Sequence, residues 1–404
     1  DGRIQPVSGI LSSAVMANDN KFTEIIVPAQ NTREAAIVNG IKVIGVKTLA
    51  EAVSYISGKL AIQPERSTSL NVEGNTRSSI SESFEIDFDD IKGQESAKRA
   101  LIIAAAGGHN ILLYGPPGSG KTLLAKAINS ILPPMSIDEA IEITKIVSIN
   151  GSLGSKALVT RRPFRNPHHS TSSVAIIGGG SWPRPGEISL AHRGVLFLDE
   201  FPEFPRTVIE ALRQPLEHGE VVVSRAAGSV RFPSRFMLVA AMNPCPCGNY
   251  GDPIKACICS PQAINRYQRK ISGPILDRID LQINVPRETI RTLSSDKKTA
   301  TLGNIAKLVS DARNTQLSRY SKTTILTNAE LTARSIELYC PIDPNVKELL
   351  VSAAQKLNLS GRGYHKTIKI ARTIADLENS HSIESRHIAE ALNYRTRKDE
   401  TLIA

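Results

Sequence analysis

The sequence is poor in aromatic residues and lacks any long apolar stretch. Aromatic side chains make up 4% of its 404 residues, which excludes an aromatic-rich surface for stacking bases. No uninterrupted apolar run approaches the roughly 18 residues of a membrane-spanning helix, so we expect no membrane partner. The chain starts at Asp1, without Met and without a basic and apolar leader. We expect a cytoplasmic protein, and such a start leaves open both a complete chain and a piece of a longer one.

Cysteine is also scarce, and its distribution is uneven. Cys340 stands alone, whereas the other four of the five cysteines crowd into a C-x-C…C-x-C pattern formed by Cys245, Cys247, Cys257 and Cys259. Such crowding argues against a disulfide framework and for a reducing compartment. Four thiolates this close could converge on a tetrahedral zinc ion. Because C-x-C is tighter than the usual C-x₂-C, buried or reducible thiols are the alternative.

The charge is strongly one-sided. A formal net charge of +10 and a pI near 9.4 favour polyanionic partners, nucleic acid before an anionic membrane. A solvated basic surface is the alternative. The length suffices for two or three domains with real cores.

The most informative stretch is a glycine-rich loop between an apolar run (110–114) and a helix-compatible run (123–132). Strand, glycine loop and helix are the context of a phosphate-binding P-loop. Glycines let successive N–H groups point at phosphate oxygens, and the helix adds the positive end of its dipole. Lys121 can reach the terminal phosphates of ATP, and Thr122 can offer its hydroxyl to Mg²⁺. The predicted nucleotide-binding residues are Gly115, Pro116, Pro117, Gly118, Ser119, Gly120, Lys121 and Thr122.

Two further apolar strands end in polar residues that suit the same site. The run 194–198 ends in Asp199 and Glu200, a Walker B pattern, in which Asp199 would hold Mg²⁺ and Glu200 would polarise the attacking water. The run 236–242 ends at Asn243, which could orient that water; an ordinary Asn-Pro turn is the alternative.

Basic residues gather in the segments around these strands. The stretch 161–169 is rich in arginine and ends in His168 and His169, which we expect to be loop residues rather than outside ligands of the cysteines. The runs 221–225 and 230–232 predict a β-hairpin with basic residues near its turn. These loops could touch DNA phosphates, contact a neighbouring subunit or be merely solvated.

Arg278 and Arg362 are the candidate arginines downstream. Arg278 could reach the γ-phosphate of a neighbouring subunit, or pair with Asp277 and Asp280 in its own chain. From about residue 304 the pattern is helical and predicts a small lid, whose last helix Ser382 would cap. Arg362 could point at nucleotide from that lid, with an exposed arginine as the alternative.

Several of these motifs together resemble the YifB/ComM family of magnesium-chelatase-like bacterial AAA+ ATPases. The resemblance covers the chain from Asp1 to about Arg395, and the stretches that carry it are 88–94, 162–169, 186–200, 243–248 and 273–280. It implies an α/β fold with a parallel sheet flanked by helices. The domains would be a small α/β unit at 1–62, a linker at 63–86, an AAA+ core at 87–300 with inserted hairpins and the cysteine cluster, and a helical lid at 301–404.

The resemblance also implies roles. Lys121 and Thr122 match Walker A, Asp199 and Glu200 match Walker B, and Asn243 matches sensor 1. Arg278 matches a trans-acting arginine finger. Arg362 matches sensor 2, with Lys369 and Arg372 as competitors for that role. Members of the family are hexameric ring ATPases, and branch migration of DNA in natural transformation is implied. A chelatase-type motor for a protein partner and a nucleotide-dependent scaffold are the alternatives.

Residues 1–62 resemble the C-terminal half of a Lon-protease-like domain. In Lon proteases the segment similar to residues 6–11 carries a catalytic lysine, and Leu11 stands there in this chain. We therefore expect no peptidase activity.

Overall fold

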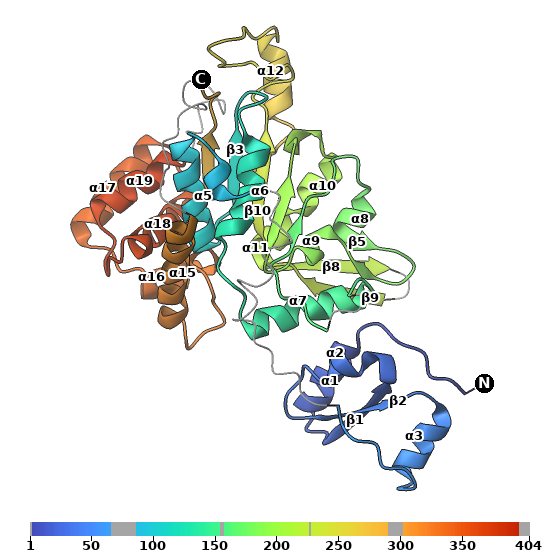
Figure 1. Ribbon diagram of the computed structural model, residues 1–404. Coiled ribbons are helices and arrows are strands. Elements are labelled where there is room, and N and C mark those ends of the chain that lie inside the picture. Colours follow the sequence, from blue (N-terminus) through green and yellow to red (C-terminus); the bar gives the residue numbers. More distant parts are fainter. Residues whose placement is uncertain (1, 66–85, 154–156, 226–227, 290–301, 396–404) are drawn as a thin grey trace.

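A computed structural model describes residues 2–65, 86–153, 157–225, 228–289 and 302–395 (Figure 1). At its centre is a five-stranded sheet in the order β11-β3-β10-β7-β4, and each neighbouring pair is parallel. Helices flank the sheet, and a helical region follows it, so the predicted fold class is confirmed. The expected linker at 63–86 lies almost wholly outside the described residues. The strands are β3 (Ile111–Tyr114), β4 (Phe164–Arg165), β7 (Val195–Leu198), β10 (Met237–Met242) and β11 (Leu281–Asn284).

Both faces of this sheet are buried, which explains the uninterrupted apolar runs in its strands. Successive side chains of a strand point to opposite faces. Leu113, Phe197 and Val239 accordingly belong to one hydrophobic core, whereas Leu112 and Leu198 belong to another. The sheet is therefore the middle layer between two cores.

The first core contains the two helices next to the P-loop and the C-terminal helices. Ile370, Ile374 and Leu377 are buried there, as their helical spacing predicts. Ser382 does not cap the last helix: Glu384 does, in a reciprocal capping box with His387. The helices of this layer are α5 (Glu95–Gly107), α6 (Lys121–Ile131), α15 (Leu302–Arg319), α16 (Ala333–Tyr339), α17 (Pro344–Lys356), α18 (Gly361–Leu377) and α19 (Ser385–Asn393), with the 3₁₀ turns η2 (Phe88–Asp90) and η4 (Asn328–Glu330).

The second core lies under short helices and the predicted hairpin, which is confirmed as an antiparallel pair of strands with its turn residues 226–227 outside the described part. A second small antiparallel pair joins β5 and β6. The elements here are α8 (Ser173–Ile177), β5 (Gly178–Gly179), β6 (Arg184–Pro185), α9 (Glu187–Leu190), η3 (Phe201–Glu203), α10 (Arg206–Ala211), α11 (Arg213–His218), β8 (Glu220–Arg225), β9 (Gly228–Pro233), α12 (Pro261–Gln268) and α13 (Gly273–Leu276).

The N-terminal unit has its own small parallel pair of strands and packs on α7 (Figure 1). Leu11 is fully buried in a core that includes Ala140 and Ile143 of α7, so its side chain has a packing role. Leu49, Val53 and Ile56 recur at helical spacing along α3 and form an apolar stripe, which is exposed. This unit comprises α1 (Ile10–Asp19), β1 (Glu24–Pro28), η1 (Ala29–Asn31), α2 (Thr32–Ala35), β2 (Lys42–Val46) and α3 (Leu49–Ile56), and α7 spans Ile137–Ile149.

The C-terminal helices contact the sheet at the ends where its strands begin. His109, just before β3, shares a 2.7 Å hydrogen bond with Thr373 of α18, and Lys366 of α18 bonds Asp280, just before β11. The predicted lid is therefore packed against the base of the sheet in its own chain, away from the loop that follows β3. None of the described helices is long and apolar enough to cross a membrane.

Candidate nucleotide-binding site

The glycine-rich loop leaves β3 and enters α6, as the sequence predicts. Gly118 and Gly120 have φ values of +75° and +91°, and nothing lies within 4 Å of a Cβ at either position. These two residues thus combine the left-handed backbone of a phosphate cradle with open space in front of it. Gly115 serves close packing instead, because a Cβ there would lie 2.1 Å from the Val285 carbonyl oxygen. Ser119 has a buried Oγ without a hydrogen-bond partner in the described structure.

Lys121 is the cation of this site. Its ammonium group donates to the carbonyl oxygens of Gly115 and Pro116, both at 2.8 Å, and to Oδ1 of Asn243 at 3.2 Å. Burial lowers the pKa of Lys121 to about 8, against the opposing effect of Asp199. A buried ammonium that bonds only neutral oxygens is well suited to an anionic ligand.

The magnesium-binding pair predicted from the sequence is assembled. The hydroxyl of Thr122 donates to Oδ2 of Asp199 at 2.8 Å, although the two residues are far apart in the chain. The strand order explains this, since β10 lies between β3 and β7 and brings Asn243 beside both. Hydroxyl and carboxylate oxygens suit Mg²⁺, so these residues fit the Mg²⁺–triphosphate that the P-loop implies.

Glu200 has a partner that the sequence did not reveal. Its Oε2 lies 3.2 Å from Nδ1 of His169, and both line one cavity with Asn166 and Asp199. Glu200 has a left-handed backbone with φ +51° at the N-cap of the 3₁₀ turn that follows β7. His169 lies in a turn, as expected from the sequence, but its contact with Glu200 was not predicted. β4 pairs with β7, so the loop that follows β4 and carries His169 lies beside Asp199 and Glu200. A strand recognised within the arginine-rich stretch 161–169 was the only sequence signal for this contact.

Arg278 and Arg362 lie elsewhere and share one carboxylate. Arg278 contacts Oε2 of Glu217, and Arg362 donates to Oε1 of the same residue at 2.6 Å. Glu217 lines a cavity with Asn110 and Gly194, which precede β3 and β7. This is the opposite end of the parallel sheet from the P-loop. Glu217 escaped the sequence analysis because nothing local distinguishes a glutamate on a short helix.

The alternative ion pairs for Arg278 do not form. Asp280 instead bonds Lys366 at 2.6 Å, and Lys366 with His109 holds the pKa of Asp280 at about 2 despite burial. The competitors for the role of Arg362 are also engaged: Lys369 bonds the Ala329 carbonyl at 2.9 Å, and Arg372 is buried against Asp376.

Basic residues of the segment 161–169 are partly structural. Arg162 forms a two-pronged contact with Glu139, and Arg165 does the same with Glu187. Arg161 is exposed, and further exposed basic side chains lie on two neighbouring segments. Arg231 is 76% exposed on β9, and Trp182, 72% exposed, stands two residues before the exposed Arg184. β5 contacts β8, so the Trp182 loop and the hairpin are neighbours.

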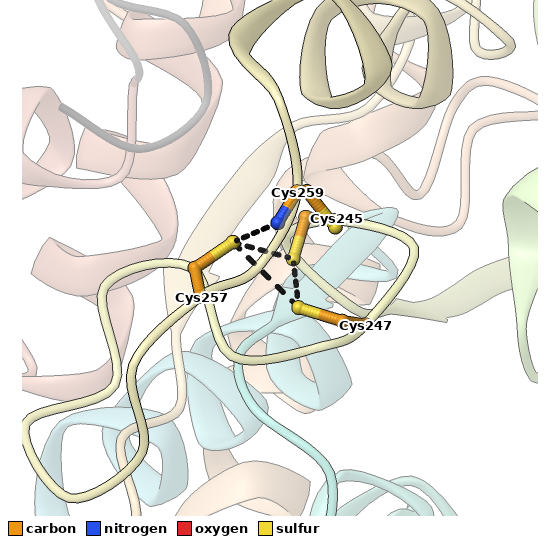
Figure 2. Close-up of side chains that lie close together, drawn as sticks. All are labelled: Cys245, Cys247, Cys257 and Cys259. Carbon is orange, nitrogen blue, oxygen red and sulfur yellow. Dashed lines mark hydrogen bonds between the residues drawn. The ribbon is translucent and has the colours of Figure 1, made fainter.

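The four crowded cysteines meet in space (Figure 2). All four Sγ atoms lie within 4.8 Å of one another, and none forms a disulfide. Backbone N–H groups, that of Asn249 foremost, lower the pKa of Cys247 to about 6, which favours one thiolate in the cluster. Such a group could hold a metal ion.

The chain matches two protein-family models that together cover its P-loop core and its C-terminal helices. Residues 87–293 match "Magnesium chelatase, subunit ChlI", and residues 300–395 match "Magnesium chelatase, subunit ChlI C-terminal". The chain is 42% identical over 399 residues to "Competence protein ComM" of Haemophilus influenzae, covering 98% of this chain and 75% of that protein.

Two further relatives extend this picture. "Uncharacterized protein YifB" of Escherichia coli is 40% identical over 398 residues, again 98% of this chain and 75% of the relative. The "Magnesium-chelatase 38 kDa subunit" of Rhodobacter capsulatus is 28% identical over 234 residues, 52% of this chain and 62% of that subunit.

Proposed function

The chain belongs to the magnesium chelatase ChlI family, together with ComM and YifB, and from this premise we propose that it is a cytoplasmic, ATP-hydrolysing ring motor that acts on DNA. The observation that carries the proposal is the convergence of Lys121, Thr122, Asp199 and Asn243 from three separate strand ends. The resemblance implies a hexamer that drives branch migration in recombination or natural transformation, on branched or single-stranded DNA.

Each residue of the site has a distinct task. Lys121 exchanges its backbone carbonyl partners for the terminal phosphates, and the N–H groups of the loop from Gly115 to Thr122 surround the remaining oxygens. Thr122 and Asp199 would hold Mg²⁺, and the ion would supply positive charge beside the phosphates. Glu200 accepts the proton of the attacking water, and Asn243 orients that water. His169 positions Glu200 through its side-chain contact.

The arginine pair supports assembly into a ring. Arg278 precedes β11 and the P-loop follows the parallel β3, so the length of the sheet separates them. Four residues of strand span about 13 Å, which is beyond direct contact between Arg278 and a γ-phosphate on the same chain. Arg278 and Arg362 therefore serve the nucleotide of a neighbouring subunit, with Glu217 holding both guanidinium groups together.

We assign the DNA contact to two neighbouring segments beside the second core, the loop that carries Trp182 and the hairpin of β8 and β9. Trp182 offers a ring for stacking on a base, while Arg184 and Arg231 offer charge to phosphates. The net charge of +10 supports a polyanionic partner.

A steady-state ATPase assay with and without branched DNA tests the proposal. We expect turnover that DNA stimulates and that Lys121→Ala abolishes. Turnover indifferent to any DNA would favour the second candidate, a motor that remodels a protein partner, for which the similarity to a magnesium-chelatase subunit is the support. A well-assembled preparation without turnover would leave only a nucleotide-dependent scaffold.

For the cysteine cluster we propose zinc as the metal. Four sulfur ligands in a tetrahedral arrangement select zinc over magnesium or calcium, which prefer oxygen.

A further inference from the structure

The spacing of the cysteine sulfurs matches a closed metal site. In a tetrahedral zinc–thiolate site with Zn–S bonds of about 2.3 Å, neighbouring sulfurs are about 3.8 Å apart. The separations are 3.4 Å for Cys245–Cys247, 3.7 Å for Cys245–Cys257 and 3.6 Å for Cys247–Cys257 (Figure 2). The Sγ of Cys259 lies within 4.8 Å of each of the other three sulfurs. A disulfide needs about 2.05 Å, so the geometry is that of four ligands around one centre.

Backbone N–H groups point at the sulfurs, as they do around metal-bound thiolates. The N–H of Tyr250 donates to Sγ of Cys245 and that of Cys259 to Sγ of Cys257, both at 3.4 Å. Such outer-shell donors disperse the charge of coordinated sulfur and fix its direction. A neutral thiol is only a weak acceptor and gains less from them.

The loop that the cysteines close lies directly against the P-loop. Gly248 has φ +82°, and a Cβ there would lie 2.7 Å from Cδ of Pro117. Arg287 donates to the Pro117 carbonyl oxygen at 3.1 Å and forms an ion pair at 3.1 Å with Asp252, whose side chain is fully buried. The cysteine loop thus touches Pro117 directly and again through Arg287.

The same loop begins at the residue that bonds the P-loop lysine. Asn243 follows β10 directly, accepts the hydrogen bond from Lys121, and is followed after Pro244 by the first two cysteines. Gln268 of α12 anchors this turn by donating to the Pro244 carbonyl at 3.1 Å. The P-loop therefore depends on the position of residues 243–259 at two points, Pro117 and the hydrogen bond between Lys121 and Asn243.

We propose that one zinc ion, held by Cys245, Cys247, Cys257 and Cys259, fastens the segment 243–259 as a brace for the P-loop, so that zinc occupancy sets the affinity for ATP. This deepens the proposed function and rests on its ATP-binding site. Binding replaces the thiol protons by the ion without any change in oxidation state. Without the ion, no metal–sulfur bonds join the four cysteines, the loop loosens, and Pro117 and Asn243 lose their support.

The test compares zinc content with nucleotide affinity in the full chain. Wild-type protein, a Cys257→Ser/Cys259→Ser variant and a Cys340→Ala control are purified without added metal, and zinc is measured by elemental analysis. Binding of a fluorescent ATP analogue is measured on each. Cys340 is buried in the first core and outside the cluster, so the control reports a lost thiol without a lost ligand.

We expect about one zinc per chain in the wild type and the control, and little in the double variant. Affinity for the analogue should fall at least about tenfold in the double variant, in the range typical of lost metal-site partners. Chelation should weaken binding by the wild type, and added zinc should restore it. Circular dichroism identifies a variant that has failed to fold.

The variant Asp252→Asn distinguishes the effect of zinc binding from the effect of the contacts between the cysteine loop and the P-loop. It keeps all four cysteines but weakens the ion pair with Arg287, so zinc content should stay at the wild-type value while affinity for the analogue falls a few-fold. Wild-type protein that lacks zinc, or that contains disulfides in the cluster, would overturn the proposal. So would a folded, zinc-free variant with unchanged affinity. If wild-type protein contains zinc but binds no nucleotide, the proposed ATP site is wrong instead.

Discussion

Subunit mixing tests the assignment of Arg278 to a neighbour's active site. Lys121→Ala removes the phosphate-binding cation but leaves Arg278 intact, and Arg278→Ala does the reverse. Each variant alone should lose at least about a hundredfold in turnover, since an arginine finger contributes about 10³ to 10⁵. If Arg278 acts on another subunit, an active interface forms wherever the P-loop of an Arg278→Ala subunit meets the arginine of a Lys121→Ala subunit.

The expected recovery follows from the geometry of a head-to-tail ring. Every interface has one P-loop donor and one arginine donor, and random mixing of equal amounts gives four equally frequent combinations. Only one has both groups intact, so the mixture should regain about one quarter of wild-type turnover, whatever the ring size, if sites act independently.

The assay is steady-state ATP hydrolysis after the variants are mixed, dissociated by dilution and reassembled. Separately assembled rings, combined only at the moment of assay, are the matched control and should stay inactive. The structure places Arg278 at the base of the sheet and Thr122 with Asp199 at its top. A mixture no more active than its components, in rings that exchange subunits, would refute the assignment in trans.

Three further predictions follow from particular side chains. Glu217→Gln should lower turnover about fivefold, because a half-exposed ion pair contributes roughly 1 kcal/mol, and should leave binding of an ATP analogue unchanged. Burial lowers the pKa of His109 to about 4, so as pH falls below about 6.5 the unfolded chain binds a proton at His109 before the folded chain does. The free energy of unfolding, measured by urea titration, should therefore drop by about 2 kcal/mol between pH 7 and 5 because of this residue. His109→Gln should remove this contribution to the pH dependence. If the free energy of unfolding depends on pH in His109→Gln as steeply as in the wild type, the prediction is wrong. Trp182→Ala should weaken single-stranded DNA binding at least about fivefold, since stacking is worth about 1–3 kcal/mol, with DNA-independent turnover intact; equal affinities in a fluorescence titration would remove Trp182 from the interface.

Some features of the candidate site were predictable because consecutive residues carry their chemistry. The P-loop needs glycines, a lysine and a threonine within eight positions, and the strand ending in Asp199 and Glu200 is apolar because both faces of its sheet are buried. The hairpin of β8 and β9 and the clustering of the cysteines likewise follow from short spacings.

Amphipathic spacing was a less reliable guide to burial, because it shows that a helix has an apolar stripe but not whether another element covers that stripe. The stripe of α18 is buried, whereas Leu49 of α3 is exposed on a similar pattern. The cap of α19 was misplaced because serine is a preferred capping residue, whereas the helix begins after Glu384 through a reciprocal contact with His387 that residue preference does not predict.

The amino-acid order alone determined which groups this protein has for binding a triphosphate, a divalent ion and a soft metal. Only the tertiary structure decided which of them act together. His169 meets Glu200, Gly248 meets Pro117, and Glu217 joins Arg278 to Arg362, each because of the order of strands in the sheet and the packing of α18 at its base. Such contacts join residues far apart in the chain, and no local propensity encodes them.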